Sequence, residues 1–482
     1  LKASFCSSED HPHSVRHLPG APKEPSFPLY AGFINLKIRS LQYDVFYVLA
    51  EAIRSDPLES PLVVWQNGGP GSSSLFGFIL ENGPYILGEN GTLRYNDFSW
   101  NQYANVLYIE GPSSVGFSKV NIKYFYNLLN DESHANVNMR ALNKFMTSIH
   151  PRYRDRQYFL TGESYAGYYV PYFAQAIYNG LRTGNFVNRN FQGIALGNAA
   201  MDWESRVLAT TVQLMSMGTI SNNSGAYLLQ KWENYQKGMN GSENSIPGHR
   251  QRFIEMFTKF KRNIVYNLSL KCENQEGEKI WHVQNTATSI QCAFTEIIEE
   301  YFNRLDVQKA LHVNKGNNAT VKWIQMNRSV LNAYHILDET YHIYQELFDS
   351  AKDNFRILFF SGDLDLVCPA LHVVRGTEII ADRCDLEEVQ NAPRIWNYLG
   401  DFGGVRTSYR KRNSSMSMDV LTVRGAGHMV PITHPSRIFQ VINNFLFSDE
   451  TPIDYSRKIR RRKFNKNINT TSVSTDAISQ LL

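Results

Sequence analysis

The stretch Phe159-Leu-Thr-Gly-Glu-Ser-Tyr-Ala-Gly167 constrains the fold more than any other part of the chain. Residues 158–161 form a short apolar and β-branched run typical of a buried strand, and residues 168–177 suit a buried helix. Between them Ser164 stands among glycines and an alanine, which let a strand and a helix approach closely. The order Gly-Glu-Ser-Tyr-Ala-Gly differs from the five-residue Gly-x-Ser-x-Gly pattern but favours the same strand-to-helix elbow, which exposes a nucleophilic serine. An ordinary serine in a glycine-rich turn is the alternative.

A second glycine-rich segment, residues 67–74, follows the short strand predicted at 62–65. Its backbone can bend sharply and point N–H groups into a cleft, where they would stabilise a negatively charged oxygen. A phosphate-binding loop would need a lysine after its last glycine, but Ser72 follows Gly71. An oxyanion-binding loop is therefore favoured over a phosphate site.

Strand-like and helix-like segments alternate along most of the chain, which predicts an α/β fold with a mainly parallel sheet and a site at the carboxyl ends of its strands. Further strands are expected at 30–36, 43–50, 106–109, 191–196, 356–361 and 418–423, and helices at 131–149 and 435–447. The alternation fades over 201–320. The domain prediction is an N-terminal arm (1–28), a core in two parts (29–200 and 321–455), an inserted cap (201–320) and a basic, disordered tail (456–482).

Three residues in one order follow predicted strands: Ser164, then Asp363 or Asp365, then His428. This is the chain order of the triad in α/β-hydrolases. In such a triad the serine attacks, the histidine takes its proton, and the acid fixes the histidine tautomer. Each residue alone is a weak signal, but the order and the glycine loop together predict a hydrolase.

Composition limits other functions. With 482 residues and 43% hydrophobic content the chain can bury a large core, and no apolar run is long enough to cross a bilayer. The formal net charge of +4 becomes −3 without the seven Lys and Arg residues between Arg457 and Lys466, so no nucleic-acid-binding surface is expected. The basic run is interpreted as a processing site or a weak binder of anionic surfaces. His11, His13 and His17 are assigned to a loosely held arm rather than to a metal site.

The chain also has features of a secreted protein. Leu1 is not a methionine, so we expect a processed chain from which a signal segment was removed. Eight Asn-x-Ser/Thr sites are candidates for glycosylation: Asn90, Asn222, Asn240, Asn267, Asn318, Asn327, Asn413 and Asn469. The expected location is the secretory pathway, either in a lysosome or vacuole or outside the cell.

Several motifs together resemble the serine carboxypeptidases, and the resemblance covers roughly residues 18–450, weakening through the cap. The motifs are Trp65-Gln-Asn-Gly-Gly-Pro-Gly71, Glu81-Asn-Gly-Pro84, Gly162-Glu-Ser-Tyr-Ala-Gly167, Gly362-Asp-Leu-Asp365 and Gly425-Ala-Gly-His-Met-Val-Pro431. The resemblance implies an α/β-hydrolase fold and the release of single residues from peptide C-termini, with no metal or other cofactor.

The resemblance also assigns roles to residues of this chain. Ser164 would be the nucleophile, His428 the base, and Asp365 rather than Asp363 the acid. The N–H groups of Gly69 and Tyr165 would form the oxyanion hole, and Met429 would line the substrate pocket. The substrate carboxylate would be held by Asn67, Gly68, Glu81, Glu163 and Trp65.

Two glutamates beside a substrate carboxylate would repel it unless a proton is shared. A protonated Glu81 or Glu163 could instead donate a hydrogen bond to the substrate. We therefore expect peptidase activity to be favoured at acidic pH, with KM rising as the pH passes neutrality.

The five cysteines fit the resemblance only in part. Cys272 and Cys292 are expected to bridge the cap, although the segment between them is short, which leaves open whether the chain is cut in two. Cys368 matches a position that is often a free thiol. Pairing of Cys6 with Cys384, or of Cys368 with Cys384, stays open.

The family usually has bonded cysteines where Ser72 and Met326 stand, so the glycine loop is expected to be less constrained here and the protein less stable. Peptide or protein C-termini are the expected substrates, and a homodimer is one assembly that we consider. An acyltransferase on the same scaffold, or a protective binding partner whose surface matters more than its triad, are the alternatives to a carboxypeptidase.

Overall fold

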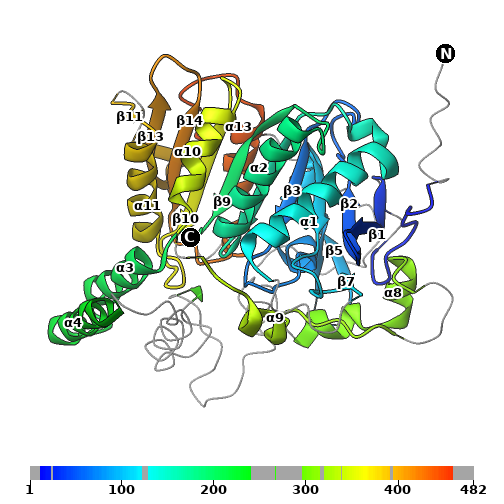
Figure 1. Ribbon diagram of the computed structural model, residues 1–482, viewed down its shortest axis with the longest axis horizontal. Coiled ribbons are helices and arrows are strands. Elements are labelled where there is room, and N and C mark those ends of the chain that lie inside the picture. Colours follow the sequence, from blue (N-terminus) through cyan, green and yellow to red (C-terminus); the bar gives the residue numbers. More distant parts are fainter. Residues whose placement is uncertain are drawn as a thin grey trace, which may run out of the picture.

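The computed structural model describes residues 11–22, 25, 27–88, 90–121, 129–239, 266–267, 296–314, 320–337, 339–390 and 394–459. A large mixed sheet runs through this part of the protein (Figure 1), with twelve strands, of which ten follow one another in the order β1-β2-β6-β3-β8-β9-β10-β14-β13-β11. The strands are β1 (Leu29–Ile38), β2 (Leu41–Ala50), β3 (Leu62–Gln66), β6 (Asn105–Ile109), β7 (Lys119–Val120), β8 (Tyr158–Glu163), β9 (Phe191–Gly197), β10 (Arg356–Gly362), β11 (Leu386–Glu388), β12 (Ile395–Tyr398), β13 (Asp401–Lys411) and β14 (Ser417–Val423). A separate hairpin joins β4 (Tyr85–Leu87) to β5 (Leu93–Tyr95).

The centre of the sheet is parallel, as the sequence predicts. Neighbouring strands from β6 through β3, β8, β9 and β10 to β14 all pair in parallel, while β1, β2, β11, β12 and β13 form antiparallel margins. Parallel strands are covered on both faces, so they consist of near-continuous apolar residues. The fully buried strands β3 and β6 are examples.

Helices cover both faces of the sheet. Successive residues of a strand point to opposite faces, so Val64 packs in one core cluster and Val63 in the other. The helices are α1 (Asp131–Lys144), α2 (Ala166–Thr183), α3 (Trp203–Ser216), α4 (Asn222–Met239), α8 (Leu305–Ala310), α9 (Arg328–Ala333), α10 (Tyr341–Ser350), α11 (Ala370–Arg383), α12 (Val430–Thr433) and α13 (Pro435–Phe447). Helices α1, α2, α10 and α11 lie side by side on one face, and α13 packs on the other. These layers form the expected α/β-hydrolase architecture.

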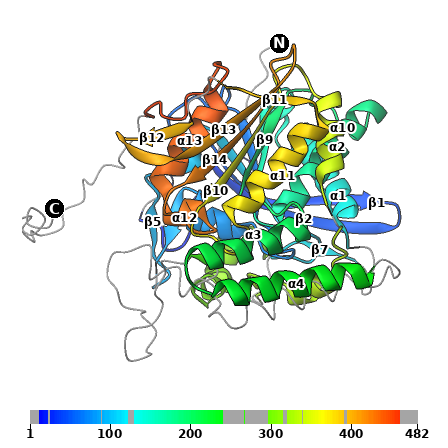
Figure 2. The same ribbon diagram turned by 90° about the vertical axis from the view of Figure 1, so that its left-hand side faces the viewer.

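The region predicted as a cap contributes α3 and α4, which pack on each other and project from one end of the sheet (Figure 2). Most of residues 240–295 fall outside the described part of the chain, as do the N-terminal ten residues and the tail beyond 459. None of the described helices is long and apolar enough to cross a membrane.

Residues 11–22 pack on the body of the protein, although the sequence predicts a loosely held arm. Ser14 bridges Tyr30 of β1, and the His11 ring stacks on His150 with ring centres 4.4 Å apart. The hydroxyl of Tyr47 lies 2.7 Å from His13 Nδ1 and 2.9 Å from His150 Nε2. Within the described part of the chain, no group of three His, Cys, Asp or Glu side chains could hold a metal ion.

Candidate active site

Ser164 stands in the turn between β8 and α2. Its φ of +61° lies in the left-handed region that residues other than glycine seldom adopt. The turn is held from β9, because the Ser164 N–H donates to the Gly197 carbonyl (3.0 Å) and the Ala200 N–H donates to the Ser164 carbonyl (3.0 Å). A Cβ at Gly162 would lie 2.6 Å from Ala166 Cβ, so glycine is needed where strand and helix meet. The serine therefore occupies a strained elbow of the kind that the sequence predicts.

His428 and Asp365 form a close pair at the carboxyl ends of the parallel neighbours β14 and β10. His428 Nδ1 lies 2.6 Å from Asp365 Oδ2, and both side chains are buried. The carboxylate also accepts the N–H groups of Val367 (2.7 Å) and Cys368 (3.0 Å). This geometry fixes the histidine with Nδ1 toward the acid, which leaves Nε2 for a proton transfer.

Asp363 does not contact the histidine. Its Oδ1 accepts the Gly425 N–H (2.6 Å) at the start of the loop that carries His428, and burial raises its pKa. The two acids of the Gly-Asp-x-Asp motif thus have different partners, and Asp365 is the one beside His428.

Asn198 joins the serine elbow to the acid and was not singled out from the sequence. It follows β9, has a φ of +41°, and donates from Nδ2 to Asp365 Oδ2 (2.8 Å). Its Oδ1 accepts the Gly362 N–H at the end of β10 (3.1 Å). Ser164 is hydrogen-bonded to Gly197 and Asp365 is hydrogen-bonded to Asn198. The ends of β8 and β10 are therefore both attached to the end of β9. In the sequence, the position of Gly197-Asn198 directly after a predicted strand could have pointed to this role of Asn198.

The loop before His428 packs tightly against its neighbours. A Cβ at Gly362 would lie 2.2 Å from the Gly427 carbonyl oxygen, and a Cβ at Gly427 would lie 2.5 Å from that of Tyr266. The His428 N–H donates to the Tyr266 carbonyl (2.7 Å), and the two rings meet edge to face at 5.3 Å. Tyr266, from the predicted cap, is a second contact that the sequence did not reveal.

The glycine loop lies directly against the serine elbow. A Cβ at Gly68 would lie 2.4 Å from the Tyr165 nitrogen and 3.0 Å from Ser164 Cβ. Gly69 has a φ of +116°, which turns the loop sharply at this point. Neither the Gly69 nor the Tyr165 N–H donates a hydrogen bond within the described part of the chain. Both N–H groups are therefore unpaired in the described structure, where the glycine loop meets the serine elbow.

Four of the five predicted carboxylate-binding residues, all except Gly68, form one buried network at the end of β3. Asn67 Nδ2 donates to Glu81 Oε1 (2.8 Å) and to Glu163 Oε1 (3.0 Å). Trp65 Nε1 donates to Asn67 Oδ1 (2.9 Å), which fixes the orientation of the amide. Burial is the main cause that raises the pKa of Glu81 to about 7 and the pKa of Glu163 well above its ordinary value. Both shifts favour the neutral acid, because burial disfavours a negative charge on either glutamate.

The chain resembles known proteins over most of its length. The serine carboxypeptidase family profile matches residues 19–448. This chain is a member of the serine carboxypeptidase family. The lysosomal protective protein of Mus musculus is 31% identical, covering 89% of this chain and 92% of the relative. Serine carboxypeptidase 24 of Arabidopsis thaliana is 30% identical, covering 94% and 96%.

A solved structure supports the fold of this serine carboxypeptidase. It is Kex1(delta)p, a prohormone-processing carboxypeptidase from Saccharomyces cerevisiae. It matches with a TM-score of 0.69 and 22% identity, and covers 92% of this chain and 97% of the other. At that identity the likeness concerns the fold alone.

The departures from the family pattern in this serine carboxypeptidase lie beside the glycine loop. Ser72 and Met326 form an isolated antiparallel bridge, with Ser72 Oγ 3.8 Å from Met326 Sδ. They face each other at the two positions where the resemblance implies bonded cysteines. Cys368 and Cys384 are buried free thiols, so neither pairing considered for Cys384 is observed. Cys6, Cys272 and Cys292 lie outside the described residues.

The glycosylation candidates of this serine carboxypeptidase differ in exposure. Asn90, Asn222 and Asn413 are exposed, Asn327 is half-buried, and Asn267 is 7% exposed. Asn240, Asn318 and Asn469 lie outside the described residues.

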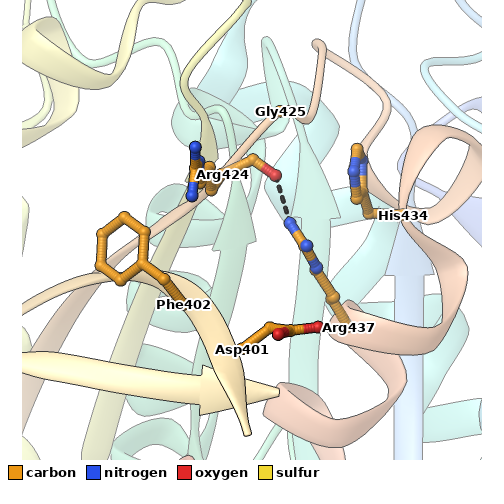
Figure 3. A pocket seen from close by; sticks show the side chains of 6 residues that line it. All are labelled: Asp401, Phe402, Arg424, Gly425, His434 and Arg437. Atoms are coloured by element: carbon orange, nitrogen blue, oxygen red, sulfur yellow. Dashed lines mark hydrogen bonds between the residues drawn. The ribbon is translucent and has the colours of Figure 1, made fainter. Parts of the chain in front are cut away.

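A surface pocket of about 370 Å³ lies next to Arg424 and Gly425, which precede His428 in the chain (Figure 3). Its lining residues are Asp401, Phe402, Arg424, Gly425, His434 and Arg437. Arg437 donates to the Arg424 carbonyl, which holds α13 to the start of the loop. Met429, predicted to line the substrate pocket, is half-buried next to His428 and is not part of this cavity.

Proposed function

We propose that this serine carboxypeptidase releases single residues from peptide C-termini through an acyl-enzyme on Ser164. The observation that carries the proposal is the 2.6 Å contact between His428 Nδ1 and Asp365 Oδ2, in a protein where Asp365 and the strained serine elbow are hydrogen-bonded to the consecutive residues Asn198 and Gly197. His428 Nε2 would take the Ser164 proton as Oγ attacks the carbonyl carbon of the terminal peptide bond. The same proton would pass to the leaving amine, and water would then hydrolyse the ester by the reverse path.

The charge that develops on the carbonyl oxygen would be stabilised by the N–H groups of Gly69 and Tyr165. Both are free of other described acceptors, and the packing of Gly68 against Tyr165 brings the two backbones together. Preorganised donors of this kind lower the barrier because they need no reorganisation during the reaction.

The C-terminal carboxylate would be held by the network of Asn67, Glu81 and Glu163. A neutral carboxylic acid can donate a hydrogen bond to a carboxylate, whereas an ionised one repels it. The raised pKa values of both glutamates support this role and favour activity at acidic pH. They also support an exopeptidase, because an internal peptide segment has no carboxylate to offer.

We infer a location in the secretory pathway. The exposed sequons at Asn90, Asn222 and Asn413 support it, and one relative is named for the lysosome. An acidic compartment would also suit a substrate site that depends on neutral glutamates.

The test combines labelling with product analysis. A fluorophosphonate probe should label the wild type and not Ser164→Ala, and a mixed peptide pool at pH 5 should lose residues only from its C-termini. An unlabelled wild type would refute the mechanism and favour a protective binding partner. Formation of an ester from a blocked dipeptide in the presence of an alcohol, without hydrolysis, would favour an acyltransferase.

A further inference from the structure

The segment 325–337, called the strap below, lies across the glycine loop. The Ser73 N–H donates to the Gln325 carbonyl (2.9 Å), and the Asn327 N–H donates to the Gly71 carbonyl (2.9 Å). Between these bonds, Ser72 and Met326 form their antiparallel bridge. The conformation of residues 71–73 therefore depends on where the strap is held.

The far end of the strap is fixed at the start of α1. The His335 N–H donates to the Leu129 carbonyl (2.8 Å), and His335 bridges Asn130. Asp131, the first residue of α1, follows immediately. Asn130 caps this helix with a capping box, so the position of Asp131 is well defined.

The carboxyl group of Asp131 connects the strap to the serine elbow. Oδ1 accepts the hydroxyl of Tyr334 in the strap (3.1 Å), and Oδ2 accepts the hydroxyl of Tyr165 (3.1 Å). Tyr165 directly follows Ser164 and provides one of the two donors assigned to the oxyanion hole. The Tyr165 and Tyr334 rings also meet edge to face, with centres 5.8 Å apart.

Asp131 is completely buried, and a buried carboxyl is costly unless its hydrogen bonds are satisfied. No Lys or Arg lies within ion-pair distance of Asp131 among the described residues. It is stabilised by the two tyrosine hydroxyls, by hydrogen bonds from the backbone of Leu337 in the strap and of Asp131 itself, and by the positive end of the α1 dipole. A polar residue in this position does not add hydrophobic stability, which suggests that it is there for the contacts it makes.

We propose that Asp131 is a positioning residue that, through the hydroxyls of Tyr165 and Tyr334, holds the strap and the glycine loop against the serine elbow. The effect on catalysis rests on the proposed function, because it assumes that the N–H groups of Gly69 and Tyr165 bind the oxyanion. Asp131 contacts neither donor directly, so it acts on their relative position. These hydrogen bonds of Asp131 to Tyr165 and Tyr334, called the clamp below, take the place of a covalent link between residues 72 and 326.

The decisive variant is Tyr334→Phe, which removes the strap's hydroxyl and keeps the ring contacts and Asp131 itself. Tyr344→Phe is the matched control, because Tyr344 is also buried and its hydroxyl has no hydrogen-bond partner among the described residues. Hydrolysis of a blocked dipeptide gives kcat and KM. Hydrogen exchange of the amides in residues 69–74 reports on the loop without requiring any activity.

We expect Tyr334→Phe to lower kcat roughly tenfold with little change in KM, since losing an oxyanion donor outright costs about 10²–10³ and a misplaced donor costs less. Exchange in residues 69–74 should rise in this variant and not in Tyr344→Phe. A Tyr334→Phe enzyme whose kcat or loop exchange equals that of Tyr344→Phe overturns the proposal.

A disulfide provides the rescue experiment. Opposed residues of an antiparallel bridge have Cα separations of about 4.5–5.5 Å, which a disulfide can span. We expect Y334F/S72C/M326C to regain most of its kcat when oxidised and to lose it on reduction, with Y334F under the same reductant as control. Failure of the oxidised protein to recover would show that Asp131 does not act through the loop. If wild type is not labelled by fluorophosphonate, the proposed function fails instead, and the exchange comparison alone decides the clamp.

Discussion

The pH dependence of substrate binding gives the sharpest test of the carboxylate network. Glu81 and Glu163 both accept from Asn67 Nδ2, at 2.8 and 3.0 Å, so their carboxyl groups share one donor. The second oxygen of each glutamate accepts no hydrogen bond from a described donor, and the two carboxyl groups share a hydrogen bond with each other, which requires a proton on one of them. These oxygens can carry the proton that would be donated to a substrate carboxylate, so loss of that proton should weaken binding.

The size of the effect follows from the pKa of Glu81, which is about 7. Glu81 is then about 99% protonated at pH 5 and about 9% protonated at pH 8. If binding requires the protonated form, KM should rise about tenfold between these two pH values, or about 1.4 kcal/mol. Glu163, whose pKa is also raised, would retain part of the binding and make the rise less steep.

The assay compares a blocked dipeptide with its C-terminal amide at pH 5, 6, 7 and 8. The KM of the acid should rise with pH, whereas the KM of the amide, which has no carboxylate, should not. Glu81→Gln keeps an N–H donor at every pH, so its KM for the acid should rise less with pH than that of the wild type. A wild-type KM that does not change from pH 5 to 8, or an equal rise for acid and amide, would refute the mechanism.

Other predictions concern single groups. Asp365→Asn should lower kcat by about 10³–10⁴ because His428 loses the carboxylate that fixes its tautomer, while Asp363→Asn should change kcat only a few-fold, and steady-state kinetics distinguish the two. His150 has a pKa lowered to about 2, mainly by burial, so it stabilises the fold above the unfolded pKa of about 6.5 and this stability is lost as the pH falls. Because of His150, the free energy of unfolding should therefore fall by about 2 kcal/mol between pH 7 and pH 5. In urea titrations over that range, the free energy of unfolding of His150→Gln should fall less than that of the wild type. Glycopeptide mass spectrometry of protein from a secretory host should find glycans at Asn90, Asn222 and Asn413 but not at Asn267, which is buried, or Asn327, whose Nδ2 donates to the Ser114 carbonyl (2.6 Å).

The central strands could be predicted because burial on both faces requires continuous apolar residues. The segments expected at 356–361 and 418–423 are found as β10 and β14 with nearly the same ends. Strands β12 and β13 escaped prediction because they form the margin of the sheet. Ile395 and Val405 there are about half exposed, so apolar and polar residues do not alternate cleanly.

The groups that support the candidate site were harder to find than those assigned to the reaction. Ser164, Asp365 and His428 follow strands within recognisable motifs, and a strand end is visible in a sequence. Asn198 and Tyr266 act through a side-chain amide and a backbone carbonyl that reach these residues only in the folded chain. The residues in each contact are far apart along the chain, so no local sequence pattern could have predicted either contact.

In the glycine loop, contacts of this kind change the effect expected from a substitution. The absence of cysteines at Ser72 and Met326 predicts a looser loop, since a covalent bridge is missing. The folded chain nevertheless holds the loop from both sides of that bridge, through Ser73 to Gln325 and Asn327 to Gly71. Each such hydrogen bond contributes only about 1 kcal/mol, but together they fix the backbone of consecutive residues. Restraint of this loop therefore depends on how the strap is anchored, and that anchor lies more than 50 residues away from Ser72 in the sequence, at the start of α1.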